Sequence, residues 1–283
     1  MCHRVRADDA FTTGWTELAQ DRFLVRAHWP ATHPFFSPVQ GGHDPLLVVE
    51  TMRQSAMAIV HAAYGAPLDH RFLLTTLAYT CVPGRNGVRA AGNEVDLLLT
   101  MSELRRGGGQ LARLRVDWVV ERDGLTVATG TGRARLISPQ VYRRLRGEQI
   151  RPIDHWSEAD HADPDLVGRS RAQDVLIAPT ALPDAWELRA DTRHPVLFQR
   201  PNDHIPGMLL LEAARQAASA ATAPVPFVPT RGSIVFHRYA EFAGRCLLKV
   251  DGEVTPQPES AVRVVGLQDG SPVFESAFVS TPA

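Results

Sequence analysis

The chain has 283 residues and a formal net charge of -1, with 30 basic and 31 acidic side chains. Its hydrophobic content of 44% is typical of a globular protein, and the near-zero charge excludes a whole-chain basic field that would favour nucleic acid or an anionic membrane. The three cysteines, Cys2, Cys81 and Cys246, show neither CxxC nor metal-ligand spacing, which argues against a disulfide scaffold and a metal site. No segment has the apolar length of a signal peptide or a membrane span, so we expect a cytoplasmic protein.

The first half of the chain predicts a strand, a long helix and four further strands. The first strand is expected at residues 21–29. The helix begins at Asp44 and Pro45, which resemble an N-cap followed by proline at the first helical position. The later strands are rich in β-branched or alternating apolar residues and are expected at 71–82, 93–104, 110–124 and 125–137.

The second half repeats this order. A strand at 185–192 precedes a second helix, and four strands are expected at 232–242, 246–254, 260–270 and 272–280. Three residues of the first helix recur in the second at one constant spacing, and two upstream histidines recur with a slip of one residue. The pairs are Glu50 and Glu212, Arg53 and Arg215, Gln54 and Gln216, His33 and His194, and His43 and His204. The chain therefore reads as a duplicated unit.

The duplication predicts the domain boundaries and the fold. We expect an N-terminal repeat at 1–145, a polar, turn-rich linker at 146–170 and a C-terminal repeat at 171–283. Both helices are apolar on nearly every face, which is typical of a buried helix. The sequence thus predicts an α+β double hotdog, in which each unit wraps an antiparallel sheet around a long central helix.

The recurring Glu, Arg and Gln share one face of each helix because they stand at positions i, i+3 and i+4. Glu and Arg are almost never fully buried unless they are paired. Three readings are open: an ion pair on a solvated stripe, a structural polar seam that holds the two halves together, or a catalytic or substrate-binding face.

The two helix starts differ. Pro206 and Gly207 in "HIPG" place free backbone N–H groups where an anion or a polarised carbonyl oxygen can bind. Gly207 has no side chain to block close approach, whereas Leu46 occupies the corresponding point in the first half. The two sites need not be equivalent.

These motifs carry a family resemblance. "DHIPGMLLLEAARQA" resembles the helix start of β-hydroxyacyl-ACP dehydratases. Together with "HDPLLVVETMRQ" in the first half, it resembles more closely the A-factor biosynthesis (AfsA-type) family of γ-butyrolactone synthases, over nearly the whole chain from Phe23 to Val279. The resemblance implies an acyltransferase that joins a β-ketoacyl group from acyl carrier protein to dihydroxyacetone phosphate, the first step towards a γ-butyrolactone or butenolide signalling molecule.

The resemblance also implies a set of site residues. The expected catalytic residues are Glu50, Glu212, Arg215, His194 and His33, and the expected substrate-binding residues are Arg53, Gln54, Gln216, Gly207, His204 and His43. A Glu whose pKa is raised by burial would act as the base, and Gly207 would stabilise the oxyanion. The arginines would bind phosphate or orient the Glu. In the related dehydratases a His of one unit faces an acid of the other, which would pair His194 with Glu50 or His33 with Glu212.

The expected partners are acyl carrier protein and dihydroxyacetone phosphate, without a cofactor, metal, nucleic acid or membrane, in a monomeric double hotdog or a homodimer. A hotdog dehydratase or thioesterase acting on acyl-carrier thioesters is the alternative enzyme. A non-catalytic acyl-binding module is the alternative outside enzymes. The arginine-rich segment 143–151 either docks an acidic acyl carrier protein or is a solvated linker.

Overall fold

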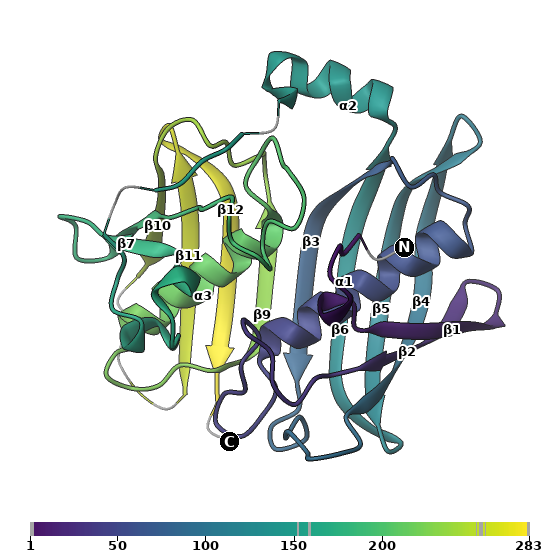
Figure 1. Ribbon diagram of the computed structural model, residues 1–283, viewed down its shortest axis with the longest axis horizontal. Coiled ribbons are helices and arrows are strands. Elements are labelled where there is room, and N and C mark those ends of the chain that lie inside the picture. The colour runs from purple at the N-terminus through teal and green to yellow at the C-terminus, as the bar shows by residue number, and fades with distance from the viewer. Residues whose placement is uncertain are drawn as a thin grey trace. The chain divides into compact units, whose positions relative to one another are not determined.

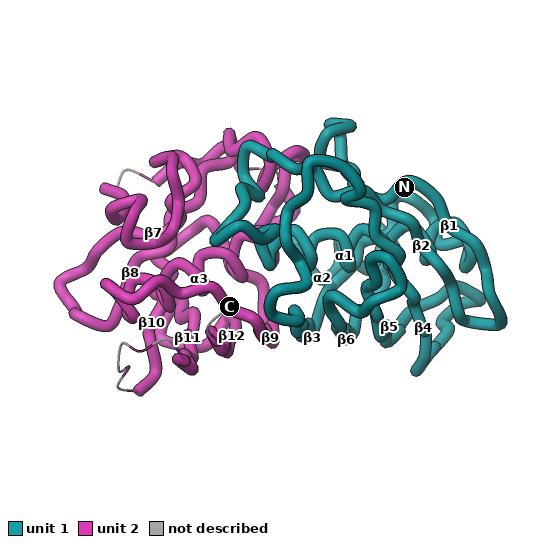
Figure 2. The backbone as a smooth tube through the Cα atoms, turned by 90° about the horizontal axis from the view of Figure 1, so that it is seen from below, with its two compact units in different colours: residues 1–147 teal, residues 148–283 magenta. Residues whose placement is uncertain are grey.

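A computed structural model of the chain describes residues 3–281 except 152, 158–159, 253, 255–256 and 258. The chain forms two units, Met1–Gly147 and Glu148–Ala283 (Figure 2). Most of the segment predicted to be a linker therefore belongs with the second unit. None of the described helices is long and apolar enough to cross a membrane.

Unit 1 contains one long helix, α1 (Pro45–Ala62), which lies along one face of an antiparallel sheet (Figure 1). The strand order of this sheet is β1-β2-β4-β5-β6-β3. The strands are β1 (Thr12–Ala19), β2 (Arg22–His28), β3 (Arg71–Cys81), β4 (Glu94–Gly107), β5 (Gln110–Arg122) and β6 (Leu125–Ile137). A short helix, α2 (Pro139–Arg146), follows β6. Part of the arginine-rich segment read as a solvated linker is therefore helical, because Ser138 caps this helix and proline begins it.

Unit 2 repeats the arrangement around α3 (Gly207–Thr222). The strand order of its sheet is β9-β12-β11-β10-β8-β7. The strands are β7 (Ile177–Pro179), β8 (Ala185–Leu188), β9 (Pro229–Phe236), β10 (Cys246–Asp251), β11 (Ser260–Gln268) and β12 (Ser271–Ser280). Each unit forms one hotdog, so the double hotdog expected from the sequence is confirmed. The strand expected at 246–254 runs in part over residues outside the described set.

Each unit has one strand more than the sequence predicts. In unit 1 the additional strand is β1, an edge strand whose residues are nearly all exposed, so it lacks the alternation of apolar and polar residues that marks a half-buried strand. In unit 2 it is β7, which is only three residues long and contains Pro179. Both strands lie at sheet edges, where pairing on one side tolerates such sequences.

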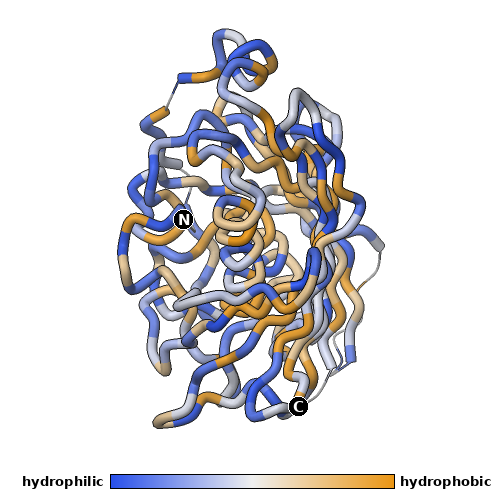
Figure 3. The backbone as a smooth tube through the Cα atoms, turned by 90° about the vertical axis from the view of Figure 1, so that its right-hand side faces the viewer, coloured by the Kyte–Doolittle hydropathy of each residue, from blue (hydrophilic) through white to orange (hydrophobic). Residues whose placement is uncertain are grey.

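The core of unit 1 forms between α1 and the inner face of the sheet. Apolar side chains of α1 such as Leu47, Met52 and Ile59 are completely buried. A Cβ atom at Gly130 of β6 would lie 2.7 Å from the Met52 sulfur, so glycine allows the helix to approach this strand closely. Figure 3 shows the hydrophobic residues gathered along the helices and the strands beside them.

The two cores are filled differently. The hairpins β5–β6 and β11–β12 both turn through an Asp-Gly pair with positive φ, so β6 and β12 can be compared by counting from these turns. On this count Gly132 of unit 1 corresponds to Phe278 of unit 2. Phe278 is 2% exposed and fills the interior of unit 2, whereas in unit 1 the ring of Trp118 packs against Gly132, 3.1 Å from where a Cβ atom would lie.

Candidate functional site

Glu50 is completely buried in unit 1, and its carboxylate is surrounded by donors. Arg53, one helical turn further on, donates from Nε to Oε2 at 2.8 Å and from Nη2 to Oε1 at 2.8 Å. Arg4, from the N-terminal segment, donates from Nε to Oε1 at 2.8 Å, and the amide of Gln54 adds a further bond at 2.8 Å. The trio predicted from the sequence is thus assembled around a buried charge, with Arg4 as an additional member.

Unit 2 contains the same arrangement. The buried Glu212 accepts from Arg215 Nε at 2.8 Å and from Arg215 Nη2 at 2.7 Å. Arg169 donates from Nε at 2.8 Å, and Gln216 donates at 2.8 Å. The solvated-stripe reading of the trio is wrong, because both carboxylates are 0% exposed.

The pKa values of the two buried carboxylates differ from those expected from the sequence. Burial alone raises the pKa of Glu50, but the charges of Arg4 and Arg53 and their hydrogen bonds outweigh it and lower the pKa to about 2. Arg169 and Arg215 act in the same way on Glu212, against the effect of burial, and lower its pKa to about 2. The prediction that burial raises these pKa values is wrong, and a carboxylate that binds protons this weakly is a poor general base.

The two glutamines connect each helix to the segment that precedes the sheet. Gln54 donates to the carbonyl of Asp9 at 2.7 Å and accepts from the N–H of Phe11 at 2.9 Å. Gln216 makes the matching bonds to the carbonyl of Asp174 at 2.8 Å and the N–H of Leu176 at 2.7 Å. The polar bonds of each trio described here therefore lie inside its own unit.

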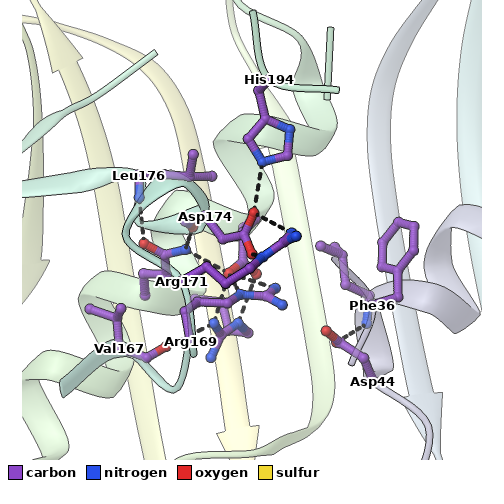
Figure 4. Close-up of polar contacts among 12 residues, drawn as sticks. Phe36, Asp44, Val167, Arg169, Arg171, Asp174, Leu176 and His194 are labelled. Carbon is purple, nitrogen blue, oxygen red and sulfur yellow. Dashed lines mark hydrogen bonds and ion pairs between the residues drawn. The ribbon is translucent and has the colours of Figure 1, made fainter. Parts of the chain in front are cut away.

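The histidines of the two HP loops are held by the same segments. His194 Nδ1 accepts from the N–H groups of Val196 at 3.3 Å and Leu197 at 3.1 Å. The ring proton must then sit on Nε2, which lies 3.1 Å from the carboxylate of Asp174 (Figure 4). Burial raises the pKa of Asp174, but hydrogen bonds from His194 and Arg171 outweigh it and keep this carboxylate ionised.

His33 is held in the same way in unit 1. Its Nδ1 accepts from the N–H groups of Phe35 and Phe36, both at 3.1 Å, and its Nε2 lies 2.7 Å from Asp9. A histidine with both ring nitrogens engaged inside its own unit is better suited to fixing its loop than to removing a substrate proton. The pairing of His194 with Glu50, or of His33 with Glu212, stays a prediction.

The residues that bind the buried glutamates and the loop histidines were not predicted, although a repeated sequence motif contains them. "RVRADD" at 4–9 and "RSRAQD" at 169–174 share the pattern R-x-R-A-x-D. Its first arginine binds the buried glutamate, and its aspartate binds the histidine. The pattern is short and polar, so only a search for repeats outside the helices would have found it.

The helix starts are unequal, as the sequence predicted. Asp44 caps α1 by accepting from the N–H of Leu46 at 2.8 Å. The N-cap of α3 is Pro206, which has no side-chain cap. A Cβ at Gly207 would lie 2.9 Å from the ring of Phe236, so this glycine is also required by packing.

The two histidines before the helices also differ. His43 is 2% exposed and lies 3.3 Å from Asn93, and burial lowers its pKa, so the ring is neutral at pH 7. The His204 side chain is 25% exposed, and its Nδ1 lies 2.8 Å from the carboxylate of Asp203. A carboxylate on one ring nitrogen orients the ring.

A cavity of about 90 Å³ lies in unit 1 between α1 and strands β3, β5 and β6. Its walls are mostly apolar and are formed by Arg53, Ala56, Met57, Val60, Phe72, Leu74, Leu77, Leu114, Val116, Trp118, Gly132, Arg133 and Ala134. In this wall Trp118 packs against Gly132, at the point where unit 2 has Phe278. Among the described residues, no group of three or more His, Cys, Asp or Glu side chains is placed to hold a metal ion.

The comparisons with known proteins agree with this geometry. Residues 1–138 and 153–256 match the model of the A-factor biosynthesis hotdog domain. The chain belongs to this A-factor biosynthesis family. It is 48% identical to 2-oxo-3-(phosphooxy)propyl 3-oxoalkanoate synthase of Streptomyces coelicolor, with 97% of this chain and 88% of that protein covered. The protein of the same name from Streptomyces griseus is 46% identical, with 98% of this chain and 93% of that protein covered. The one from Streptomyces virginiae is 38% identical, with 99% of this chain and 96% of that protein covered.

Solved structures with the same fold are less similar to this chain in sequence. The 12:0-ACP thioesterase of Umbellularia californica has a TM-score of 0.51 at 13% identity, with 92% of this chain and 98% of that chain covered. An acyl-ACP thioesterase of Bacteroides thetaiotaomicron has a TM-score of 0.54 at 11% identity, with the same shares covered. At these identities the likeness establishes the double hotdog fold alone.

We predict that Glu212→Gln destabilises the protein by about 3–5 kcal/mol, because the amide leaves two buried guanidinium groups without their anion. Urea unfolding followed by circular dichroism measures the change. Glu103→Gln is the matched control, because Glu103 is exposed and binds Arg133 at the surface. An equal effect of both substitutions would contradict the role given to the buried charge.

The two low pKa values also predict acid sensitivity. Each glutamate has a pKa of 4.5 when unperturbed and about 2 when folded, so its stabilising contribution is complete above pH 4.5 and is lost as the pH falls towards 2. The free energy of unfolding should fall over this range, and less steeply in the Glu212→Gln variant. Parallel pH profiles of the two proteins would show that folding does not lower the pKa of this carboxylate.

Proposed function

We propose that the chain transfers a 3-oxoacyl group from the thioester of acyl carrier protein to the primary hydroxyl of dihydroxyacetone phosphate. The thioester C–S bond breaks, an ester C–O bond forms, and the hydroxyl proton passes to the released thiolate. The product is a 2-oxo-3-(phosphooxy)propyl 3-oxoalkanoate, the compound in the name of the Streptomyces relatives. The observation that carries the proposal is the apolar cavity of unit 1 beside a fixed guanidinium, in a chain that matches those synthases nearly end to end.

The cavity supports binding of the acyl chain. Its wall combines aliphatic and aromatic side chains from the sheet with the small residues Ala56, Gly132 and Ala134. Each buried CH₂ group of a ligand contributes about 0.8 kcal/mol, so a mostly apolar cavity favours an alkyl chain over a sugar or a nucleotide.

Arg53 supports binding of the polar end of the substrate. Its side chain is 25% exposed and lines the cavity, while Glu50 holds its Nε and Nη2 atoms. Its Nη1 lies 2.8 Å from the sulfur of Met57, a weak acceptor that a keto or phosphate oxygen can replace. Glu50 then serves as a positioning residue that fixes a cation.

Arg215 is less suited to phosphate. Its side chain is only 11% exposed, and its Nη2 donates both to Glu212 and to the carbonyl of Val167 at 2.9 Å. Of the two roles that the sequence left open for the arginines, orientation of the glutamate has the stronger geometric support here.

Within unit 2, His204 has the geometry best suited to a base. Glu50 and Glu212 have pKa values of about 2, and His33 and His194 have both ring nitrogens engaged. His204 is partly exposed and oriented by Asp203, a pairing that suits general base catalysis. The start of α3, which lacks a side-chain cap, lies three residues further on and offers N–H groups to a developing oxyanion.

The reaction predicts a specific product from purified components. The protein, mixed with a 3-oxoacyl carrier thioester and dihydroxyacetone phosphate, should yield the phosphorylated ester by mass spectrometry, and His204→Ala should lower kcat by roughly 10²–10⁴-fold. Free acid or a dehydrated thioester formed without the phosphate would instead identify a thioesterase or dehydratase. No turnover of any kind would favour a non-catalytic acyl-binding module.

The cavity predicts chain-length selectivity. Ala56→Leu adds three carbon atoms to the cavity wall, so kcat/KM for a long acyl chain should fall at least roughly tenfold relative to a chain three carbons shorter, at about 0.8 kcal/mol per CH₂. Ala58→Leu is the matched control, since Ala58 is equally half-buried on the same helix but does not line the cavity. Unchanged selectivity in Ala56→Leu would place the acyl chain elsewhere.

A further inference from the structure

Three arginines stand directly opposite one another on the outer face of the unit 1 sheet. Arg105 of β4 is paired in register with Arg113 of β5, and Arg113 is paired with Arg135 of β6. Residues opposite one another on neighbouring strands share a face of the sheet. Leu114 and Ala134 next to them line the inner cavity, so this arginine row faces solvent, and all three residues are exposed.

The arginine row lacks acidic partners among the residues that the structure describes. The adjacent pair on the same face is different: Arg115 binds Asp117 at 2.7 Å, and Arg133 binds Glu103 at 2.7 Å. Among the described residues, the side chains of Arg105, Arg113 and Arg135 form no ion pair or hydrogen bond, whereas the nearby Glu103 is bound by Arg115 and Arg133. The sheet therefore neutralises one arginine pair and leaves the next row uncompensated.

Like charges directly opposite one another destabilise a sheet. The chain as a whole has a net charge of -1, so the row is a local concentration of positive charge and not part of a general basic surface. Such a cost is offset when an external anion binds across the row.

Helix α2 extends the positive surface. It follows β6 immediately after Arg135 and Ser138, and Figure 1 shows it beyond the end of that strand. Tyr142 on its buried face lies under the guanidinium of Arg71, at 5.2 Å from the ring centroid. Its Arg143 and Arg144 are exposed and have no ion-pair partner in the described ranges.

We propose that the arginine row together with Arg143 and Arg144 is the docking surface for the acidic carrier protein that delivers the acyl thioester. This inference rests on the proposed function. The surface is an exposed sheet face and an adjoining helix, whereas sites for small anions such as a sugar phosphate are concave. Cations spread over three strands and a helix fit the carboxylates spread over one face of an acidic protein. The same strands β5 and β6 carry the cavity on their inner face, so the carrier would dock on the unit that receives its acyl chain.

The test compares Arg113→Ala/Arg135→Ala with the wild-type chain on two substrates. One is the 3-oxoacyl thioester of acyl carrier protein, and the other is the same acyl group on N-acetylcysteamine, which has no protein part. At low ionic strength the variant should raise KM for the carrier substrate roughly tenfold, leave kcat unchanged, and leave kinetics with the small thioester unchanged. Added salt should raise KM of the wild type towards that of the variant.

Arg263→Ala is the matched control. Arg263 is an exposed arginine on β11 of unit 2 and is paired with Asp251 at 2.7 Å and with Glu275 at 2.6 Å. Its removal should not change KM for the carrier. Because Arg113 and Arg135 are exposed and unpaired in the described structure, their replacement should also leave the thermal unfolding midpoint unchanged or slightly raised.

The outcomes separate the docking surface from the function. If the wild type forms ester from both thioesters and the arginine variant has the wild-type KM for the carrier, the docking surface is wrong and the function stands. If the wild type forms no ester from either thioester, the function itself fails. Binding of the wild type, but not of the variant, to anionic vesicles or RNA, with no change in KM for the carrier, would overturn the carrier as the partner.

Discussion

The structure depends on burying one carboxylate inside each unit. A buried glutamate is stable only when opposite charge and hydrogen bonds replace the water that it loses, and here two arginines and a glutamine do so. The requirement ties the central helix to the N-terminal segment of its unit, and through Asp9 and Asp174 it also fixes the histidine loops. The same compensation removes the glutamate from acid–base chemistry, so a residue that resembles a dehydratase acid in sequence serves here to hold an arginine.

The two copies share this buried charge cluster but differ at their helix starts and in their cores. In unit 1 the helix start is capped by Asp44, and a mostly apolar cavity lies between α1 and the sheet. In unit 2 the helix start has no side-chain cap, and Phe278 fills the interior. The two units have therefore kept the buried charge cluster and differ in the structure around it.

Much of this could be predicted from the sequence, because the signals are periodic or repeated. The apolar helices, the alternating strands and the recurring trio predict the double hotdog, and the unequal helix starts are visible in Leu46 and Gly207. The charge state of Glu50 could not be predicted, because it is set by Arg4, which is distant in sequence and becomes a neighbour only after folding. Strand β1 was missed because an exposed edge strand has no apolar pattern, and the cavity depends on how Gly132 meets Trp118 in three dimensions.

The contrast between Gly132 and Phe278 has a consequence for how such proteins diversify. The cavity wall is built from residues that take no part in the buried charge clusters apart from Arg53. Substitutions along β6 and the cavity side of α1 can therefore resize the pocket while the folding framework stays intact. Under the proposed function, a few small-to-large exchanges in this wall would change the acyl length that the cavity accepts.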